Sequence, residues 1–206
     1  MNNMYWMAEQ SKNVDKQYKL GDDLNTLVSK DETNHIYFYS GVGPKSSLEL
    51  NKILQMKANE LLSINTKYNI TEKPKIYLHI SSFGGSLFAG ISSMDTIFSI
   101  RKDVDIITIA EGGVASAGTF ISIAGTKRLM TANSFILIHQ LASTYSGKYR
   151  ELKDDMENSE ELMDMIRTVY GKYTKVPSEE LDKILDRDLW LNSKKCLAYN
   201  LVDEII

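Results

Sequence analysis

The fold is decided by residues 76–86, which read IYLHISSFGGS. Apolar residues alternate here with Tyr77 and His79, and a period of two predicts a strand that ends at Gly84-Gly85. The next residues carry an apolar stripe at helical spacing, formed by Leu87, Ile91, Met94 and Phe98. Residues 104–109 then predict a second strand of the same unit. This strand, helix, strand order predicts parallel pairing through right-handed crossovers, and hence an α/β fold.

The segment before this unit predicts one strand and one long helix. Residues 36–39 are aromatic and β-branched, which favours a strand. Ser46 and Glu49 have capping-box spacing, so we expect a helix to start there. Its apolar face carries Leu50, Ile53, Leu54, Ala58, Leu61 and Leu62. Residues 1–34 are polar and aperiodic, so we expect a loosely ordered arm followed by one packed domain over 35–206.

The segment after this unit continues the α/β pattern. Residues 135–138 form an apolar run that suits a strand buried on both faces, and His139 follows directly. Residues 147–170 predict a long charged helix whose apolar stripe is wide enough to bury against a partner. Two shorter helices are expected near the end of the chain, capped by Ser178 and Ser193.

The overall composition excludes several classes of protein. The chain has 206 residues, of which 43% are hydrophobic and 25% charged, as in ordinary globular proteins. The net charge of -3 provides no electrostatic footprint for nucleic acid or anionic lipid. Cys196 is the single cysteine, so an intrachain disulfide is impossible. Because no apolar run approaches the roughly 18 residues that cross a bilayer and no signal-peptide pattern is present, we expect a cytoplasmic protein without a membrane partner.

Residues 112–118, GGVASAG, carry the strongest indication of chemistry. A strand reaches the glycine pair at 112–113, where we expect the turn into a helix that opens at Ser116. Ser116 is either a helix N-cap or a nucleophile whose neighbouring first-turn amides stabilise an oxyanion. Gly84-Gly85, on the adjacent turn, would supply a second amide donor. The glycine before Ser116 lies three residues back instead of two, so we do not expect a nucleophile elbow.

A nucleophilic serine needs a base that removes its proton. Of the three histidines, we expect His35 to be solvated and His79 to be structural. His139 follows a buried strand, and a parallel neighbour would bring it to the same sheet edge as Ser116, either as the base or as a satisfied core histidine. Spacing alone leaves the orienting carboxylate open among Asp154, Asp155, Asp164, Asp182, Asp186, Asp188 and Asp203. Asp188 is favoured because the apolar residues that follow it would draw it inward, where it needs a partner.

Motifs for other chemistry are missing from the sequence. There is no contiguous Gly-Lys-Ser/Thr phosphate loop, no His-Glu-x-x-His and no cysteine pair. We therefore expect no metal and no cofactor, and any ATP dependence would come from a partner.

Four motifs in order resemble the proteolytic subunit of Clp protease, ClpP, peptidase family S14, over roughly residues 74–206. Residues 76–85 are similar to the family's strand and INSPGG turn, and residues 113–118 to its GQAASMG nucleophile motif. Residues 138–140, IHQ, resemble its IHQP. Residues 186–203, which begin DRD and end AYNLVD, are similar to its ERD…EYGLVD.

The resemblance implies roles for five residues of this chain. Ser116 would be the nucleophile, His139 the general base and Asp188 the carboxylate that orients it. The backbone amides of Gly85 and Ala117 would form the oxyanion hole.

The resemblance also implies an architecture and partners. It predicts a ClpP/crotonase-like spiral of β/α units with a protruding handle helix, at about 142–172. It implies heptameric rings, stacked as a tetradecamer with Asp186 and Arg187 at the ring contact. An AAA+ unfoldase ATPase would feed unfolded polypeptide into the enclosed chamber.

The leading hypothesis is a serine endopeptidase that hydrolyses unfolded polypeptides inside an oligomeric chamber through an acyl-enzyme intermediate. One alternative keeps the fold without the chemistry, as a structural or regulatory ring subunit. Another is a crotonase-type acyl-CoA enzyme, which uses a similar pair of amides to hold an enolate and needs no Ser-His-Asp set.

Overall fold

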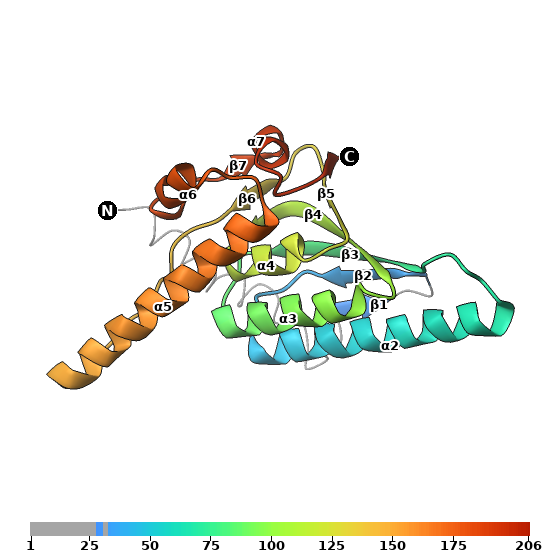
Figure 1. Cartoon of the computed structure of the whole chain (residues 1–206), viewed down its shortest axis with the longest axis horizontal. Helices are drawn as coiled ribbons and strands as arrows, with labels where there is room; N and C mark the ends of the chain where they lie inside the picture. Colours follow the sequence, from blue (N-terminus) through green and yellow to red (C-terminus); the bar gives the residue numbers. More distant parts are fainter. Residues whose placement is uncertain (1–27, 31–32) are drawn as a thin grey trace, which may run out of the picture.

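A computed structural model of the chain describes residues 28–30 and 33–206, and within these residues the backbone forms one eight-stranded sheet with helices around it (Figure 1). The strands are β1 (Val28–Lys30), β2 (His35–Phe38), β3 (Lys75–Ser82), β4 (Asp105–Ala115), β5 (Lys127–Met130), β6 (Phe135–Leu137), β7 (Leu191–Asn192) and β8 (Glu204–Ile205). The helices are α2 (Pro44–Tyr68), α3 (Leu87–Ile100), α4 (Ala117–Ile123), α5 (Tyr149–Tyr173), α6 (Ser178–Leu185) and α7 (Ser193–Ala198).

The predicted α/β arrangement is confirmed. Strands β2, β3, β4 and β5 pair in parallel, and β8 continues the sheet beyond β5. Helices α2 and α3 lie side by side against one face of this sheet (Figure 1). The alternation in β3 has the expected effect, because Ile76, Leu78 and Ile80 are fully buried while Tyr77 and His79 on the opposite face are half-buried.

Strand β4 changes partner halfway along its length. Its first part pairs with β5 at Ile107–Ala110, and its last part pairs with β6 at Gly113–Ala115. Gly112 lies between the two parts with a φ of 62°, a backbone conformation that favours glycine. The expectation that Gly112-Gly113 form the strand-to-helix turn is therefore wrong, because these glycines lie inside β4 and the turn comes at Ser116.

Three of the predicted helix caps differ from the structure. Helix α2 begins at Pro44, a residue that fits the first helical position, and the Ser46 Oγ accepts a hydrogen bond from the Gly43 N–H at 3.0 Å. Ser46 is therefore the third helical residue, and its hydroxyl binds the backbone amide of the N-cap residue Gly43 instead of being the N-cap itself. Ser178 is already inside α6, and the cap of α7 is Asn192, whose side chain accepts from Lys195 N–H. In each case the helix begins earlier in the chain than it would if the serine were its N-cap.

The described part of the chain begins within the expected arm. Residues 28–30 form β1, which pairs antiparallel with β2, so the sheet extends upstream of His35. For residues 1–27 and 31–32, the arm prediction lies outside the described residues.

Helix α5 is the most prominent feature of the outline, because its first half projects away from the body (Figure 1). It begins at Tyr149 and ends at Tyr173, close to the predicted long helix, and only its last turns contribute buried residues. Within the described ranges, the helices lack the combination of length and apolar character that would let one span a membrane.

Candidate active site

Strands β4 and β6 bring Ser116 and His139 to the same place. Ala115 is in register with Leu137, and the Ser116 N–H donates to the Leu137 carbonyl at 2.9 Å. Ser116 directly follows β4 and His139 lies two residues beyond β6, so both leave the carboxyl ends of paired parallel strands. Both line one cavity of about 530 Å³. The predicted convergence of these two residues at one sheet edge is confirmed.

The backbone at Ser116 is strained. Its φ of 53° and ψ of -129° lie where residues with a Cβ are rarely found, and such conformations persist only where the surroundings hold them. Its side chain makes no capping hydrogen bond to α4. Ser116 therefore occupies the N-cap position of α4, as the alternative predicted, but its hydroxyl does not cap the helix. A strained turn from a strand into a helix is also the backbone geometry of a nucleophile elbow. The expectation that no such elbow is present is therefore wrong for the backbone, although the glycine spacing differs from that of an elbow.

The turn after β3 packs directly on this serine. Gly84 has a φ of 89°, and a Cβ built on it would lie 2.5 Å from the Ser116 Cβ and 2.8 Å from the Ala115 carbonyl oxygen. Neither atom belongs to a flexible side-chain end that could move away. Glycine at this position therefore allows two turns from different β/α units to touch.

Two backbone amides beside Ser116 have no hydrogen-bond partner among the described residues. Val42 bridges the neighbours of Gly85, because it donates to the Gly84 carbonyl at 2.8 Å and accepts from Ser86 N–H at 2.7 Å. The bridge leaves the Gly85 N–H unused. The Ala117 N–H is unused because a first helical residue has no carbonyl one turn before it. Both residues line the cavity, so the sequence-predicted pair of amide donors stands next to Ser116.

Asp188 is the aspartate that the structure brings to His139. Its Oδ1 lies 4.0 Å from the His139 Nδ1, within ion-pair range but too long for a hydrogen bond. Among the described residues, no hydrogen bond joins the Ser116 hydroxyl to His139, and no other aspartate forms an ion pair with this imidazole. Ser116, His139 and Asp188 therefore lie near one another, but no hydrogen bond links them as in a catalytic triad.

The neighbouring residues Asp186 and Arg187 do not reach the cavity. Asp186 is the C-cap of α6, and both side chains are exposed. Their predicted role in a ring contact stays a prediction.

The other two histidines belong to a separate network. The His79 Nδ1 lies 2.9 Å from a Glu111 carboxylate oxygen, and the His79 Nε2 lies 2.8 Å from the His35 Nδ1. His35 also stacks on Tyr77, with ring centroids 4.7 Å apart. The expectation that His35 is solvated is therefore wrong in part, because parallel pairing of β2 with β3 brings its ring against His79 and leaves the residue half-buried. Neither histidine lines the cavity.

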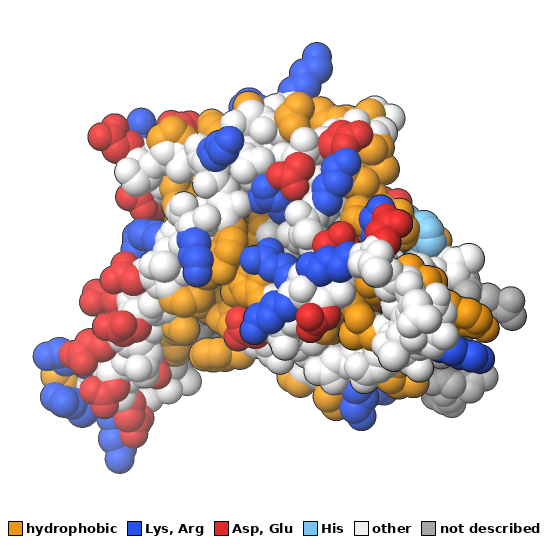
Figure 2. Space-filling view, turned by 45° about the vertical axis from the view of Figure 1, so that its right-hand side comes forward, with side chains coloured by type: hydrophobic (Ala, Val, Ile, Leu, Met, Phe, Trp, Pro, Cys, Tyr) orange, Lys and Arg blue, Asp and Glu red, His pale blue; other side chains and the backbone are white. Residues whose placement is uncertain are grey.

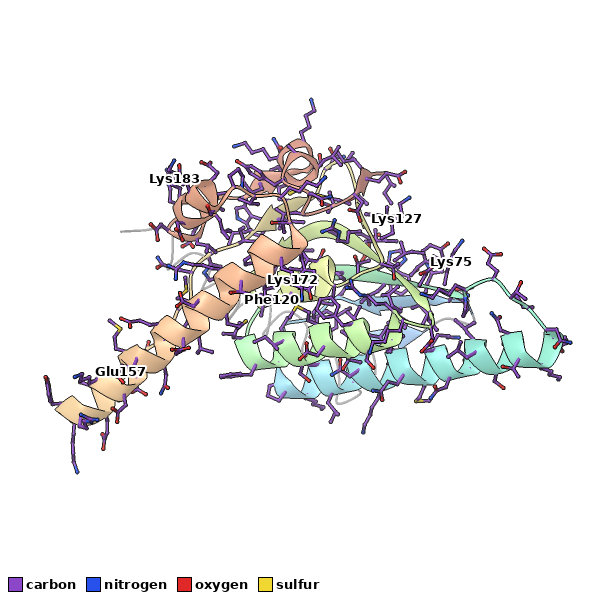
Figure 3. All side chains as sticks on the ribbon, in the orientation of Figure 1. Lys75, Phe120, Lys127, Glu157, Lys172 and Lys183 are labelled. Atoms are coloured by element: carbon purple, nitrogen blue, oxygen red, sulfur yellow. The ribbon has the colours of Figure 1, made fainter. Side chains whose placement is uncertain are left out.

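The walls of the cavity are mainly apolar. Its lining includes no Asp, Glu, Lys or Arg, and its apolar side chains come from α3, α4 and α5 and from the segment after His139. Phe120 lies where α4 meets the buried end of α5, whereas Glu157 lies on the projecting part of that helix (Figure 3). Hydrophobic side chains also gather where α5 joins the body (Figure 2). Such a cavity suits an apolar substrate side chain.

Sequence reasoning missed two polar residues beside the site. The Thr119 Oγ1 donates to the Ser116 carbonyl at 2.6 Å, and the Tyr170 hydroxyl lies 2.5 Å from the same Oγ1. Tyr170 was expected only as part of the apolar stripe of its helix. No local pattern could reveal the pair, because 51 residues separate Thr119 from Tyr170.

The described residues contain no cluster of three or more His, Cys, Asp or Glu side chains that could hold a metal ion.

With this geometry established, comparison with known proteins identifies the family. The Clp protease family model matches residues 50–206. The ATP-dependent Clp protease proteolytic subunit of Anthoceros angustus is 37% identical over 150 residues, which cover 71% of this chain and 72% of the relative. That of Oltmannsiellopsis viridis is 33% identical over 151 residues, covering 72% of this chain and 76% of the relative. Proteolytic subunit 3 of Synechococcus sp. (strain CC9902) is 34% identical over 139 residues, covering 66% and 68%. The chain therefore belongs to the Clp protease proteolytic subunit family, and the resemblance drawn from its motifs is confirmed.

Proposed function

We propose that this protein is a serine endopeptidase that hydrolyses peptide bonds of unfolded polypeptides, with Ser116 as the nucleophile. The observation that carries this proposal is that Ser116 and His139 line one cavity beside two unpaired amides. Membership of a protease family supports it independently.

The reaction would follow the Ser-His-Asp scheme. His139 removes the Ser116 proton as the hydroxyl oxygen attacks the substrate carbonyl carbon. The resulting oxyanion accepts hydrogen bonds from the Gly85 and Ala117 amides. His139 then protonates the leaving amine, which leaves an acyl-enzyme that water hydrolyses by the same route. Asp188 stabilises the imidazolium, and the 4.0 Å separation of its Oδ1 from the His139 Nδ1 would shorten once that ring is charged.

The test combines a covalent probe with a substitution. A fluorophosphonate should label the protein at Ser116, and Ser116→Ala should abolish labelling and lower the kcat for a fluorogenic peptide by about 10⁴ to 10⁶-fold. Ser143→Ala is a matched control, because Ser143 lines the same cavity but is not part of the proposed Ser-His-Asp triad. Undiminished cleavage by Ser116→Ala would refute the assignment.

The projecting helix supports a proposal about assembly. Tyr149 at its start is 85% exposed, and Leu152 and Met156 are also exposed, so this part of α5 has apolar surface without a partner in the described chain. We expect it to pack ring on ring in a tetradecamer of two heptamers, with Asp186 and Arg187 at the same contact. Native mass measurement checks the subunit number, and Met156→Glu should separate the particle into single rings.

An AAA+ unfoldase is proposed as the partner that supplies ATP-driven unfolding. Its support is the absence of a phosphate loop from this sequence, together with relatives whose names describe an ATP-dependent protease. The isolated protein should then cleave short peptides and leave folded proteins intact until an unfoldase and ATP are added.

A structural or regulatory ring subunit is the second candidate. This candidate is favoured by the lack of hydrogen bonds within the proposed triad, since His139 is hydrogen-bonded neither to Ser116 nor to Asp188 among the described residues. A silent subunit would not react with fluorophosphonate, alone or in a mixed assembly. Thioester turnover without peptide turnover would instead favour the acyl-CoA alternative.

A further inference from the structure

The peptide unit that joins Ser116 to Ala117 carries two groups with different tasks. Its N–H is the Ala117 amide of the proposed oxyanion hole, and its carbonyl is that of Ser116. Because a peptide unit is planar and rigid, holding the carbonyl also sets the direction of the N–H.

The Ser116 carbonyl is held by Thr119 and, through it, by Tyr170. The carbonyl oxygen accepts the Thr119 N–H at 2.9 Å and the Thr119 hydroxyl at 2.6 Å. The proton of that hydroxyl is thus committed, so the Tyr170 hydroxyl must be the donor in the 2.5 Å contact with Thr119 Oγ1. A directed chain of hydrogen bonds therefore runs from α5, through α4, to the Ser116 carbonyl.

This chain is shielded from water and keeps its proton order. Thr119 is 0% and Tyr170 is 1% exposed, so solvent does not compete for either hydroxyl. Burial also raises the pKa of Tyr170, which keeps its phenol protonated and able to donate.

The chain acts where the backbone needs support. Ser116 has a positive φ, and its own N–H is held by a hydrogen bond to the Leu137 carbonyl. That bond fixes the peptide before Ser116 but not the peptide after it. A conformation of this kind relaxes unless the neighbouring peptide is also held. In addition, hydrogen bonds in series polarise one another, so donation to the Ser116 carbonyl makes the Ala117 N–H a stronger donor.

We infer that Tyr170 and Thr119 are positioning residues, which aim and polarise the Ala117 N–H toward the oxyanion of the reaction. This inference rests on the proposed function, because it assigns a support to the oxyanion hole of that reaction. Since Tyr170 lies near the buried end of α5, it also connects the projecting helix to the catalytic turn.

Four variants test the inference in the full-length assembled protein: Tyr170→Phe, Thr119→Val, Thr119→Ser and the double variant Tyr170→Phe/Thr119→Val. Tyr173→Phe is the matched control, because Tyr173 lies on the same helix and its hydroxyl has no hydrogen-bond partner among the described residues. The measurements are kcat and KM for a fluorogenic peptide, the second-order rate of fluorophosphonate labelling at Ser116, the thermal midpoint and the particle mass.

We expect a loss in kcat with little change in KM. Tyr170→Phe removes one neutral hydrogen bond and should lower kcat and the labelling rate about 3- to 10-fold. Thr119→Val removes the link itself and should lower both about 10- to 100-fold, less than deletion of an oxyanion donor. Thr119→Ser should restore most of the rate. The double variant should be no slower than Thr119→Val, because Tyr170 acts through Thr119.

Two outcomes overturn the inference and can be told apart. If Tyr170→Phe and Thr119→Val keep the kcat and labelling rate of the natural protein, or lose only thermal stability, the hydroxyl pair is merely structural and the proposed function stands. If the natural protein itself neither cleaves peptides nor labels at Ser116, the proposed function fails and this inference fails with it.

Discussion

A Cβ on Gly84 would lie 2.5 Å from the Cβ of Ser116, closer than two non-bonded carbon atoms can approach. The turn that follows β3 and the turn that follows β4 are therefore in direct contact at Ser116, the proposed nucleophile. Because Gly85 comes next in the chain, this contact also fixes where the Gly85 amide lies relative to Ser116. Gly85 of the proposed oxyanion hole and the proposed nucleophile Ser116 therefore belong to one packed unit, although they come from different β/α units.

Gly84→Ala should disrupt this unit. The new methyl group must displace Ser116 or its own turn, and the φ of 89° at Gly84 is strained for alanine in any case. We expect kcat/KM to fall by about 10²-fold or more, since a displacement of 1 Å near the chemistry has that effect. The unfolding free energy should fall by about 2 kcal/mol.

The matched control is Gly171→Ala in α5. A Cβ there meets nothing within 4 Å, so the variant should keep full activity and gain about 0.5–1 kcal/mol of unfolding free energy from helix propensity. Normal activity in Gly84→Ala, measured beside this control, would show that the two turns are not packed as described.

Strain at Ser116 predicts a difference between two inactive variants. Ser116→Ala and Ser116→Gly both remove the hydroxyl, but only glycine relieves the positive φ of 53°. Relief of about 1–3 kcal/mol exceeds the roughly 0.5–1 kcal/mol of extra chain entropy that glycine loses on folding. Ser116→Gly should therefore be about 1 kcal/mol more stable than Ser116→Ala in urea unfolding. Equal stability, or a less stable glycine variant, would argue against backbone strain at Ser116.

Local periodicity was sufficient to predict much of the fold. The alternation around Ile76 reflects burial of one face of β3, which neighbouring residues report directly. The stripe of α3 correctly predicted a helix, but of its four residues only Met94 is buried, because the buried face is centred on Ala89, Gly90 and Ser93. The convergence of Ser116 with His139 also followed, because the ends of parallel strands meet at one edge. The resemblance to ClpP then singled out Asp188, a choice that spacing alone had left open.

The features that sequence reasoning missed depend on contacts between distant segments. The change of partner along β4 turned Gly112-Gly113 into strand residues, and no local pattern reports which strand pairs where. His35 is half-buried and contacts His79 because β2 pairs with β3. Tyr170 looked like an ordinary apolar-stripe residue, and only the packing of α5 on α4 gives its hydroxyl a partner.

Asp188→Asn tests whether this carboxylate orients His139. The amide keeps the size of the side chain but loses the charge that stabilises the imidazolium, so kcat should fall by about 10³ to 10⁴-fold with little change in KM. Asp164→Asn is the control, because Asp164 is 75% exposed and pairs with Arg167 on α5, away from the cavity. A kcat within twofold of the natural protein would indicate that another group orients the imidazole.

The pair Arg128–Asp203 predicts how stability changes with pH. The Asp203 carboxylate accepts the Arg128 backbone N–H at 2.8 Å and the Nε–H at 3.0 Å, and it also contacts the Arg128 Nη2. Burial by itself raises the pKa of Asp203, but the hydrogen bonds from Arg128 outweigh burial and hold the pKa below its ordinary value. The same guanidinium donates to the carbonyls of Tyr173 and Asn200, so the pair ties the end of α5 to the C-terminal segment.

Asp203→Asn should therefore lower the unfolding free energy only where the carboxylate is charged. A folded-state pKa below the unfolded one adds stability above the ordinary aspartate pKa of about 3.9, and this stability is lost as the pH falls through the folded-state value. Above about pH 5 we expect a loss of about 2 kcal/mol, because Arg128 is left without its charged partner. The difference from the natural protein should shrink steadily below pH 4 in urea unfolding, whereas Asp154→Asn, in the exposed pair with Arg150 at 3.3 Å, should have little effect across this pH range. A difference that stays constant down to the acid transition would mean that the substitution acts through packing and not through the charge of Asp203.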